Sequence, residues 1–142
     1  MPSEPPLTFP GKIALLCLVW ATAAHVRVGL WRQPLPELVA ALGTPTRRRH
    51  RPVALLGHAV SRGLRIGPWH PRCLIRSLVL YRLLRAQGDP AELILALPRH
   101  ATSHDAHAWV ELGGRDVGPL PGGQGYEELT RYPRQAARPP VP

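Results

Sequence analysis

The stretch PRCLIRSLVLYRLLRAQGDPAELILALPRHATSHDAHAWVEL, residues 71–112, decides the fold. Its first part predicts a helix over about 71–87, because leucine, isoleucine and valine recur at helical spacing with arginines between them. Pro71 suits the first turn of a helix, where its missing N–H costs nothing, and Gly88 is a typical residue to end one. Cys73 therefore lies in the first helical turn.

The position of Cys73 has two interpretations. Free backbone N–H groups and the helix dipole favour an anion in the first turn, and Arg72 and Arg76 add positive charge nearby. Such a setting favours the thiolate, which is the nucleophilic form of cysteine. The alternative is that a single cysteine on an apolar helix is a small core residue. The cysteine by itself does not decide between the two.

Two strand patterns follow this helix. Residues 91–97 form an apolar run that is typical of a buried strand, and residues 107–112 alternate in the manner of a second strand. The glycine pair at 113–114 predicts a two-residue hairpin turn into a return strand. The order helix, strand, strand therefore predicts a helix that packs on a small antiparallel sheet.

His107 opens the second strand, where period-two alternation places it on the same face as Trp109 and Glu111. A thiolate at a helix start and an imidazole on a strand are the two groups that cysteine-dependent acyl transfer needs. The imidazole takes the thiol proton and then gives it to the leaving amine. We therefore expect Cys73 and His107 to form a catalytic pair, although a strand histidine alone is more often structural.

Two motifs, CLIRSL at 73–78 and AHAWVE at 106–111, resemble the transglutaminase-like leader peptidases of lasso-peptide biosynthesis. The specific likeness covers about residues 68–133, and a looser one extends over the apolar N-terminal half. It implies a papain/transglutaminase-like α+β fold. It also implies a thiol protease that removes the N-terminal leader from a ribosomally made precursor peptide, with Cys73 as nucleophile and His107 as general base.

The third catalytic position departs from this family. The family has an acidic residue about twelve positions after the histidine, where this chain has Pro119. The nearest candidate is Asp116, which a tight turn would place opposite Glu111 on the face of His107. At ~3.4 Å per residue it would then lie about 13 Å along the sheet, too far for a hydrogen bond. A bulge could bring it closer; a backbone carbonyl, Asp105 or a water is the alternative support.

The resemblance also implies partners. Besides the precursor peptide, these are an ATP-dependent cyclase that closes the macrolactam and a small leader-recognition domain, fused or separate. The N-terminal half has no run of alternating strands to build such a domain, so we expect a separate recognition protein. The apolar N-terminal helix is its candidate docking surface, with exposure of Leu15, Leu16 and Val19 as the criterion. No cofactor is implied.

Three other functions compete with the peptidase. A non-catalytic peptide-binding module could share the fold, and a transglutaminase-type acyl transferase would use the same pair of residues with an amine as acceptor. A metal site is suggested by the spacing of His100, His104 and His107. We do not expect a metal, because that spacing falls in a loop and no second pair of ligands accompanies it.

The composition limits location and further partners. A chain of 142 residues allows one domain with a modest core, and its formal net charge is +9. Its two cysteines do not indicate a disulfide scaffold, which is typical of a reducing cytoplasm. The basic run at 47–51 is expected to be a solvated connection, or else a contact for an acidic peptide or protein. No nucleic-acid-binding motif accompanies it.

The chain divides into four predicted parts. These are a disordered N-terminus (1–10), a helical N-terminal part (11–66), the peptidase core (67–133) and a disordered tail (134–142). The helical part should hold helices over about 8–32, 35–42 and 53–64. Residues 119–125 should form a loop and residues 126–132 a short turn.

The first of these helices bears on the membrane. Its apolar run, residues 13–24, is shorter than the ~20 residues that a bilayer span needs. We therefore expect a buried core helix in a cytoplasmic protein. Membrane contact is the less favoured option, as a signal peptide or as peripheral attachment.

Overall fold

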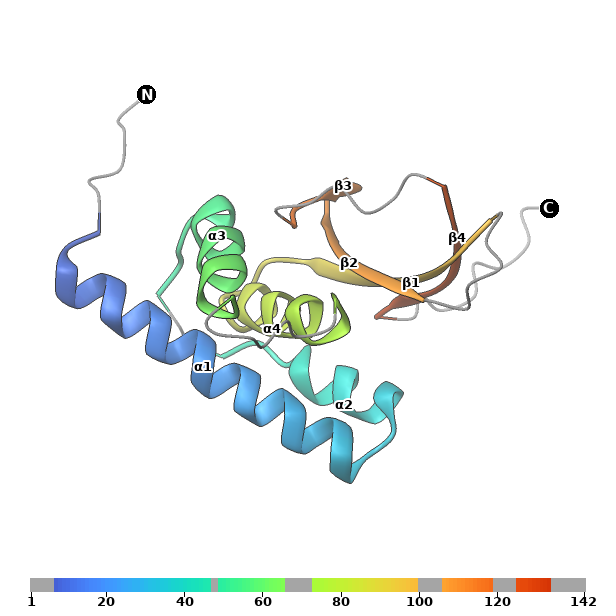
Figure 1. Ribbon diagram of the computed structural model, residues 1–142, viewed down its shortest axis with the longest axis horizontal. Coiled ribbons are helices and arrows are strands. Elements are labelled where there is room, and N and C mark those ends of the chain that lie inside the picture. Colours follow the sequence, from blue (N-terminus) through green and yellow to red (C-terminus); the bar gives the residue numbers. More distant parts are fainter. Residues whose placement is uncertain (1–6, 47–48, 66–72, 100–105, 119–124, 134–142) are drawn as a thin grey trace.

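In the described part of the chain all helices come before all strands (Figure 1). The computed structural model describes residues 7–46, 49–65, 73–99, 106–118 and 125–133. Within them lie α1 (Phe9–Arg32), α2 (Leu35–Leu42), α3 (Val53–Gly63), α4 (Cys73–Ala86), β1 (Ala91–Pro98), β2 (His107–Leu112), β3 (Arg115–Asp116) and β4 (Tyr126–Tyr132). The predicted α+β class, with a helical N-terminal half and an antiparallel sheet, is confirmed.

The sheet has the strand order β3-β2-β1-β4, with antiparallel neighbours throughout. The predicted hairpin is present, since Gly113 and Gly114 have φ values of 61° and 81° and Leu112 pairs with Arg115. Both φ values lie in the left-handed region that a type I′ turn requires, where glycine fits without strain. The glycine pair thus fixes the register of β2 and β3.

The last strand corrects the sequence analysis. Residues 126–132 form β4, a strand of seven residues that pairs with β1, and the predicted short turn is wrong. The register with β1 shifts between Leu95 and Ala96, so the alternation of β4 is interrupted where the bulge falls. Because the paired residues of β1 lie 28 to 39 positions earlier, no local pattern shows this pairing.

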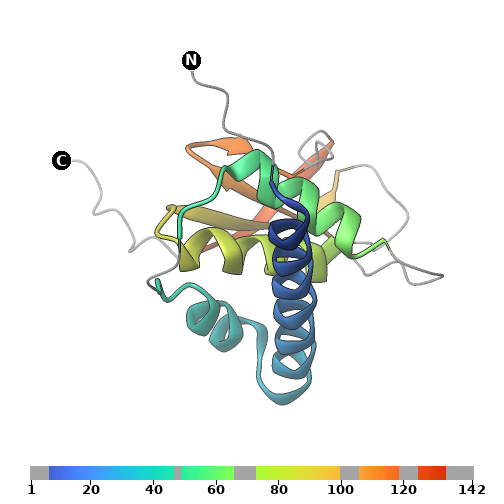
Figure 2. The same cartoon turned by 90° about the vertical axis from the view of Figure 1, so that its left-hand side faces the viewer.

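Helix α4 lies at the centre of the core, between the sheet and the other helices (Figures 1 and 2). Its residues Leu78, Val79 and Leu84 have no exposed surface, and it packs on Leu93 of β1 and Val110 of β2. Burial from several sides explains why α4 is apolar around most of its circumference. The helix that begins at Cys73 is therefore held by the core itself.

The polar side chains of α4 fasten it to its neighbours. Arg82 donates to the carbonyl oxygens of Leu42 and Thr44, at 3.0 and 2.8 Å, and Arg85 donates to that of Gly43 at 3.2 Å. These carbonyls end α2 and its following turn, where helical partners are missing, so the arginines act as a C-terminal cap. The arginines of α4 thus contribute to packing as well as to charge.

Helix α1 runs from Phe9 to Arg32, close to the predicted bounds, and it is buried in the core along one face only. One face packs inward through Leu15, Val19 and Val26. In length and composition this helix of 24 residues could cross a membrane, and only 33% of its most apolar window is buried. The argument that the apolar run is too short for a span is therefore wrong.

The expected docking surface on α1 is also corrected. Leu15 and Val19 are 3% and 0% exposed, and Leu16 is half-buried, so these residues do not form an exposed patch. They face the core because α1 packs against α3 and α4 along this side.

The predicted disordered ends fall largely at 1–6 and 134–142, outside the described residues, as does part of the basic run at 47–48.

Candidate active site

Cys73 is the first residue of α4 and is a half-exposed free thiol. Its Sγ lies 3.9 Å from the carbonyl oxygen of Ala106, the residue that precedes His107, and it is placed to donate a weak hydrogen bond there. The start of α4 therefore abuts the start of β2. The predicted neighbour Arg72 lies outside the described residues.

A second contact fastens the same two elements one helical turn further on. Ser77 is buried, and its Oγ donates to the carbonyl oxygen of Ala108 at 2.9 Å. Cys73 and Ser77 are four residues apart and thus share one face of α4. They contact the carbonyls on either side of His107. The sequence analysis did not assign Ser77, although its spacing from the cysteine was a usable signal.

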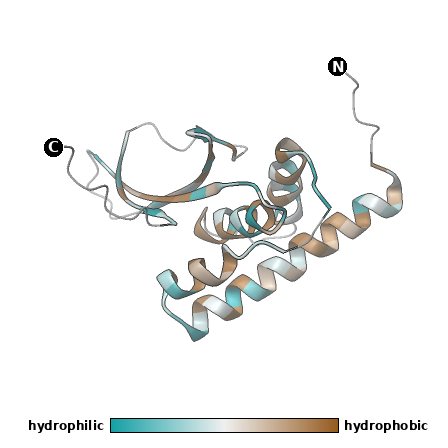
Figure 3. Cartoon of the chain, turned by 180° about the vertical axis from the view of Figure 1, so that it is seen from behind, coloured by the Kyte–Doolittle hydropathy of each residue, from teal (hydrophilic) through white to brown (hydrophobic). Residues whose placement is uncertain are grey.

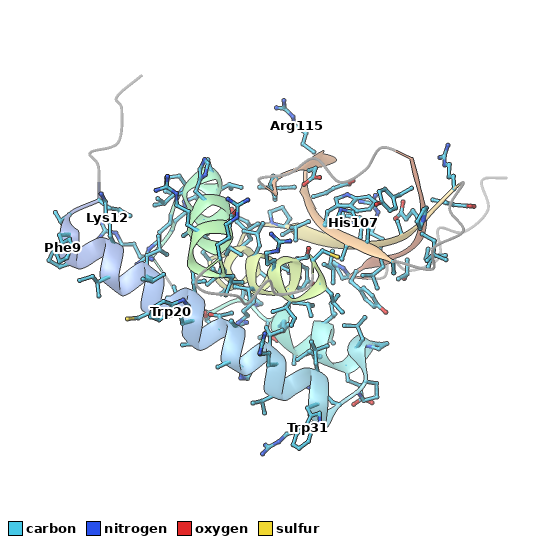
Figure 4. All side chains as sticks on the ribbon, viewed as in Figure 1. Phe9, Lys12, Trp20, Trp31, His107 and Arg115 are labelled. Carbon is cyan, nitrogen blue, oxygen red and sulfur yellow. The ribbon has the colours of Figure 1, made fainter. Side chains whose placement is uncertain are left out.

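His107, which Figure 4 shows at the sheet, has its imidazole held between two aromatic rings. The ring of Tyr126 stacks on it with centroids 4.9 Å apart and planes 29° apart, and the indole of Trp109 lies at 5.8 Å. Tyr126 reaches this position because β4 pairs with β1. Sequence reasoning missed Tyr126 because it did not predict that strand.

Trp109 is in turn fixed by an ionic network on the outer face of the sheet. Its Nε1 donates to Glu111 at 3.0 Å, and Arg131 donates to the same carboxylate at 2.9 Å. Arg131 also bonds Glu128 at 2.8 Å and lies 3.2 Å from Glu92. Its hydrogen bond to Glu128, with those to the other two carboxylates, raises the pKa of Arg131. The predicted common face of His107, Trp109 and Glu111 is consistent with these contacts.

Charge and burial act against each other on His107. Burial lowers the pKa of His107, the charge of Asp116 raises it, and the guanidinium of Arg76 lowers it. The net direction is downward, so the ring is neutral at neutral pH and able to accept a proton.

Asp116 has the register that the hairpin predicted, opposite Glu111. Its Oδ1 accepts from the backbone N–H of Gly118 at 2.8 Å, which fixes the carboxylate just beyond β3. Because its charge acts on His107, Asp116 is electrostatically coupled to the imidazole. Whether it orients the ring stays a prediction; Pro119 and Asp105 lie outside the described residues.

A small cleft of about 80 Å³ joins these groups. Its walls come from α3, α4 and β2, with Gly118 after β3, and Cys73 and His107 both line it. Among the described residues that line it, Arg76 is the only lysine, arginine, aspartate or glutamate. The arrangement brings a thiol, a neutral imidazole and one fixed cation to a mostly apolar cleft.

In the part of the chain that the structure describes, no three His, Cys, Asp or Glu side chains gather as metal ligands. His100 and His104, which suggested a metal site, lie outside that part.

We expect Ser77→Ala to destabilise the protein by about 1–3 kcal/mol, because it leaves the buried carbonyl of Ala108 without its donor. Chemical denaturation followed by circular dichroism measures this free energy of unfolding. Ser61→Ala, which removes another hydroxyl from the same cleft, is the matched control. Equal stabilities of the two variants would show that the Ser77 contact does not fasten α4 to β2.

Titration of the His107 ring by NMR, in a Cys73→Ala background that removes the thiol, tests the charges around it. We expect a pKa below the ordinary 6.5. Asp116→Asn should lower this pKa further, because it removes a charge that favours imidazolium, and Arg76→Gln should raise it. An unchanged titration in Asp116→Asn would remove that carboxylate from the site.

Comparison with known proteins agrees with this arrangement. A family model described as the transglutaminase-like superfamily matches residues 15–131, which is well over half of the chain. That superfamily includes cysteine peptidases and acyltransferases. No curated protein and no solved structure matches the chain. The chain therefore belongs to the transglutaminase-like superfamily.

Proposed function

We propose that this protein is a cysteine peptidase that removes the leader from a lasso-precursor peptide. One observation carries the catalytic part of the proposal: Cys73 at the start of α4 and His107 at the start of β2 line one cleft, with the thiol 3.9 Å from the carbonyl that precedes the histidine. The superfamily membership supports thiol chemistry at such a pair.

The proposed reaction has two halves. His107 takes the proton of Cys73, and the thiolate attacks the scissile carbonyl carbon of the substrate. The C–N bond then breaks as His107 gives its proton to the leaving amine, which leaves a thioester on Cys73. In the second half His107 takes a proton from water, the hydroxide attacks the thioester, and the C–S bond breaks to release the acid and restore the thiol.

The surroundings of the pair suit these steps. The backbone N–H groups of the first turn of α4 are the donors nearest in sequence to the thiol, and they would stabilise the oxyanion. Stacking on Tyr126 restricts the tilt of the imidazole, and the charge of Asp116 favours its protonated form once the thiolate has formed. In this proposal Asp116 is the third member of the catalytic site, and it acts on His107 through its negative charge.

The substrate part of the proposal rests on the motifs CLIRSL at 73–78 and AHAWVE at 106–111. The described part of the N-terminal half is helical, which fits a leader-recognition domain supplied by a separate protein. The ATP-dependent macrolactam cyclase would act on the product, and the reaction would take place in the cytoplasm. A transglutaminase-type transfer differs from this reaction only in its acceptor.

The pH dependence of Cys73 alkylation by iodoacetamide tests the pair. We expect the wild type to react at lower pH than His107→Ala, because the imidazole stabilises the thiolate by taking its proton. Cys17 is also a free, exposed thiol, so the experiment is done in a Cys17→Ala background. Identical profiles with and without His107 would end the proposed pairing.

Leader cleavage tests the reaction. The chain is incubated with a synthetic precursor peptide and its recognition protein in heavy-oxygen water, and the products are weighed by mass spectrometry. Hydrolysis should place one heavy oxygen in the new carboxyl group of the leader, and Cys73→Ala should slow it about a thousandfold or more.

Each other function gives its own result in this experiment. Incorporation of an added primary amine in place of heavy oxygen would identify an acyltransferase. Peptide binding without either product, in the presence of the recognition protein, would identify a non-catalytic module.

A further inference from the structure

Helix α1 has a second apolar face that nothing in the described structure covers. Phe9, Ile13, Trp20, Val28 and Trp31 are between 45% and 91% exposed, Trp31 the most. Figure 4 shows Phe9 and Trp31 near the two ends of the helix and Trp20 between them. A soluble surface helix normally carries polar residues on this face, so the exposure needs an explanation.

The spacing makes these residues one continuous stripe. Steps of three, four and seven or eight residues keep the same side of a helix, and Cys17 and Ala24 fill the gaps with further exposed, uncharged side chains. The stripe runs along 24 residues, a helix of about 36 Å. In Figure 3 hydrophobic colour recurs along the whole of α1.

An apolar groove with a basic rim runs beside the stripe. It lies between α1 and α3, has a volume of about 710 Å³, and is floored by Leu7, Leu16 and Leu55 among others. Lys12 and Arg62 are exposed cations at its edge. An apolar floor with cations at the rim matches an acyl chain that ends in an anionic headgroup.

The charged residues of α1 indicate the charge of the partner that this face would bind. Between Phe9 and Gln33 there is no Asp or Glu, whereas Lys12 and Arg32 are exposed near opposite ends of α1, and the chain carries a formal net charge of +9. A second copy laid along this face would bring like charges together without an acid to pair them. An anionic surface is therefore the complementary partner.

We propose that α1 docks the protein on an anionic lipid bilayer, with the helix lying in the plane of the interface. The aromatic rings of Phe9, Trp20 and Trp31 enter the boundary between headgroups and acyl chains, where aromatic side chains are favoured. The Nε1 of Trp20 already donates to the carbonyl oxygen of Gly63 at 2.8 Å, so its ring can be buried in lipid without losing a hydrogen bond. Lys12, Arg32 and Arg62 contact the headgroups.

Docking in this pose leaves the candidate active site open. The cleft of Cys73 and His107 is lined by α3, α4, β2 and Gly118, and no residue of α1 lines it. Figures 1 and 2 show α1 on the side of α4 opposite the sheet. A bilayer on the outer face of α1 thus leaves room for a peptide at the sheet.

Vesicle co-sedimentation of the full chain tests the proposal. We expect binding to phosphatidylcholine vesicles that contain about a third phosphatidylglycerol, and much weaker binding to phosphatidylcholine alone, with loss at high salt. The triple variant Ile13→Ser/Val28→Ser/Trp31→Ser should bind about tenfold more weakly or worse. The double variant Lys12→Glu/Arg62→Glu should lose roughly 25-fold, about fivefold for each cation.

Matched variants control for general hydrophobicity and charge. Leu129→Ser removes an apolar side chain that is 60% exposed on β4, and Arg115→Glu reverses an exposed charge near β3; both should bind vesicles like the wild type. Near-ultraviolet circular dichroism confirms that each variant is folded.

Two results would overturn the proposal. One is absence of binding to vesicles of either composition, or equal binding to both. The other is a wild-type dimer in sedimentation velocity that the triple variant converts to monomer, which would identify a second copy as the cover of α1. Neither result bears on the peptidase proposal, because Cys73 alkylation is measured separately.

Discussion

The carbonyls along the edge of β2 that faces away from β1 are the constraint on which the candidate site depends. Val110 accepts a hydrogen bond from Val117 on this edge, and by alternation the carbonyls of Ala108 and Ala106 face the same way. Strand β3 is only two residues long and does not reach them. The carbonyl of Ala108 is buried and therefore requires a donor, which Ser77 supplies. The carbonyl of Ala106 is exposed and has the thiol of Cys73 at 3.9 Å, so both contacts hold α4 against the strand of His107.

The imidazole of His107 on this strand is supported by aromatic rings and by the charge of Asp116. Burial favours the neutral imidazole and is the largest effect, and the charge of Asp116 opposes it by favouring the protonated form. Tyr126 and Trp109 restrict the ring, and Glu111 holds Trp109 through its indole N–H. The imidazole of His107 is therefore positioned by a network that spans β1, β2 and β4.

The sequence predicted those elements whose pattern lies within a short stretch of the chain. Apolar spacing gave α4, β1 and β2, and the glycine pair at 113–114 gave the hairpin and the register of Asp116. The position of Tyr126 could not be predicted, because it depends on a pairing with β1 that a bulge interrupts. Ser77 could have been found from its spacing to Cys73. The outer face of α1 could not, since composition shows that a helix is apolar but not which of its sides is covered.

The position of β4 in the chain has a consequence for the timing of activity. Proteins emerge from the ribosome with the N-terminus first, and β4 follows every other described element. Helix α4 and its thiol can therefore pack while the ring that stacks on His107 has not yet been synthesised. In the proposed peptidase, the support of the histidine is complete only with this last strand, so the imidazole lacks its stacking partner while the chain is still being synthesised.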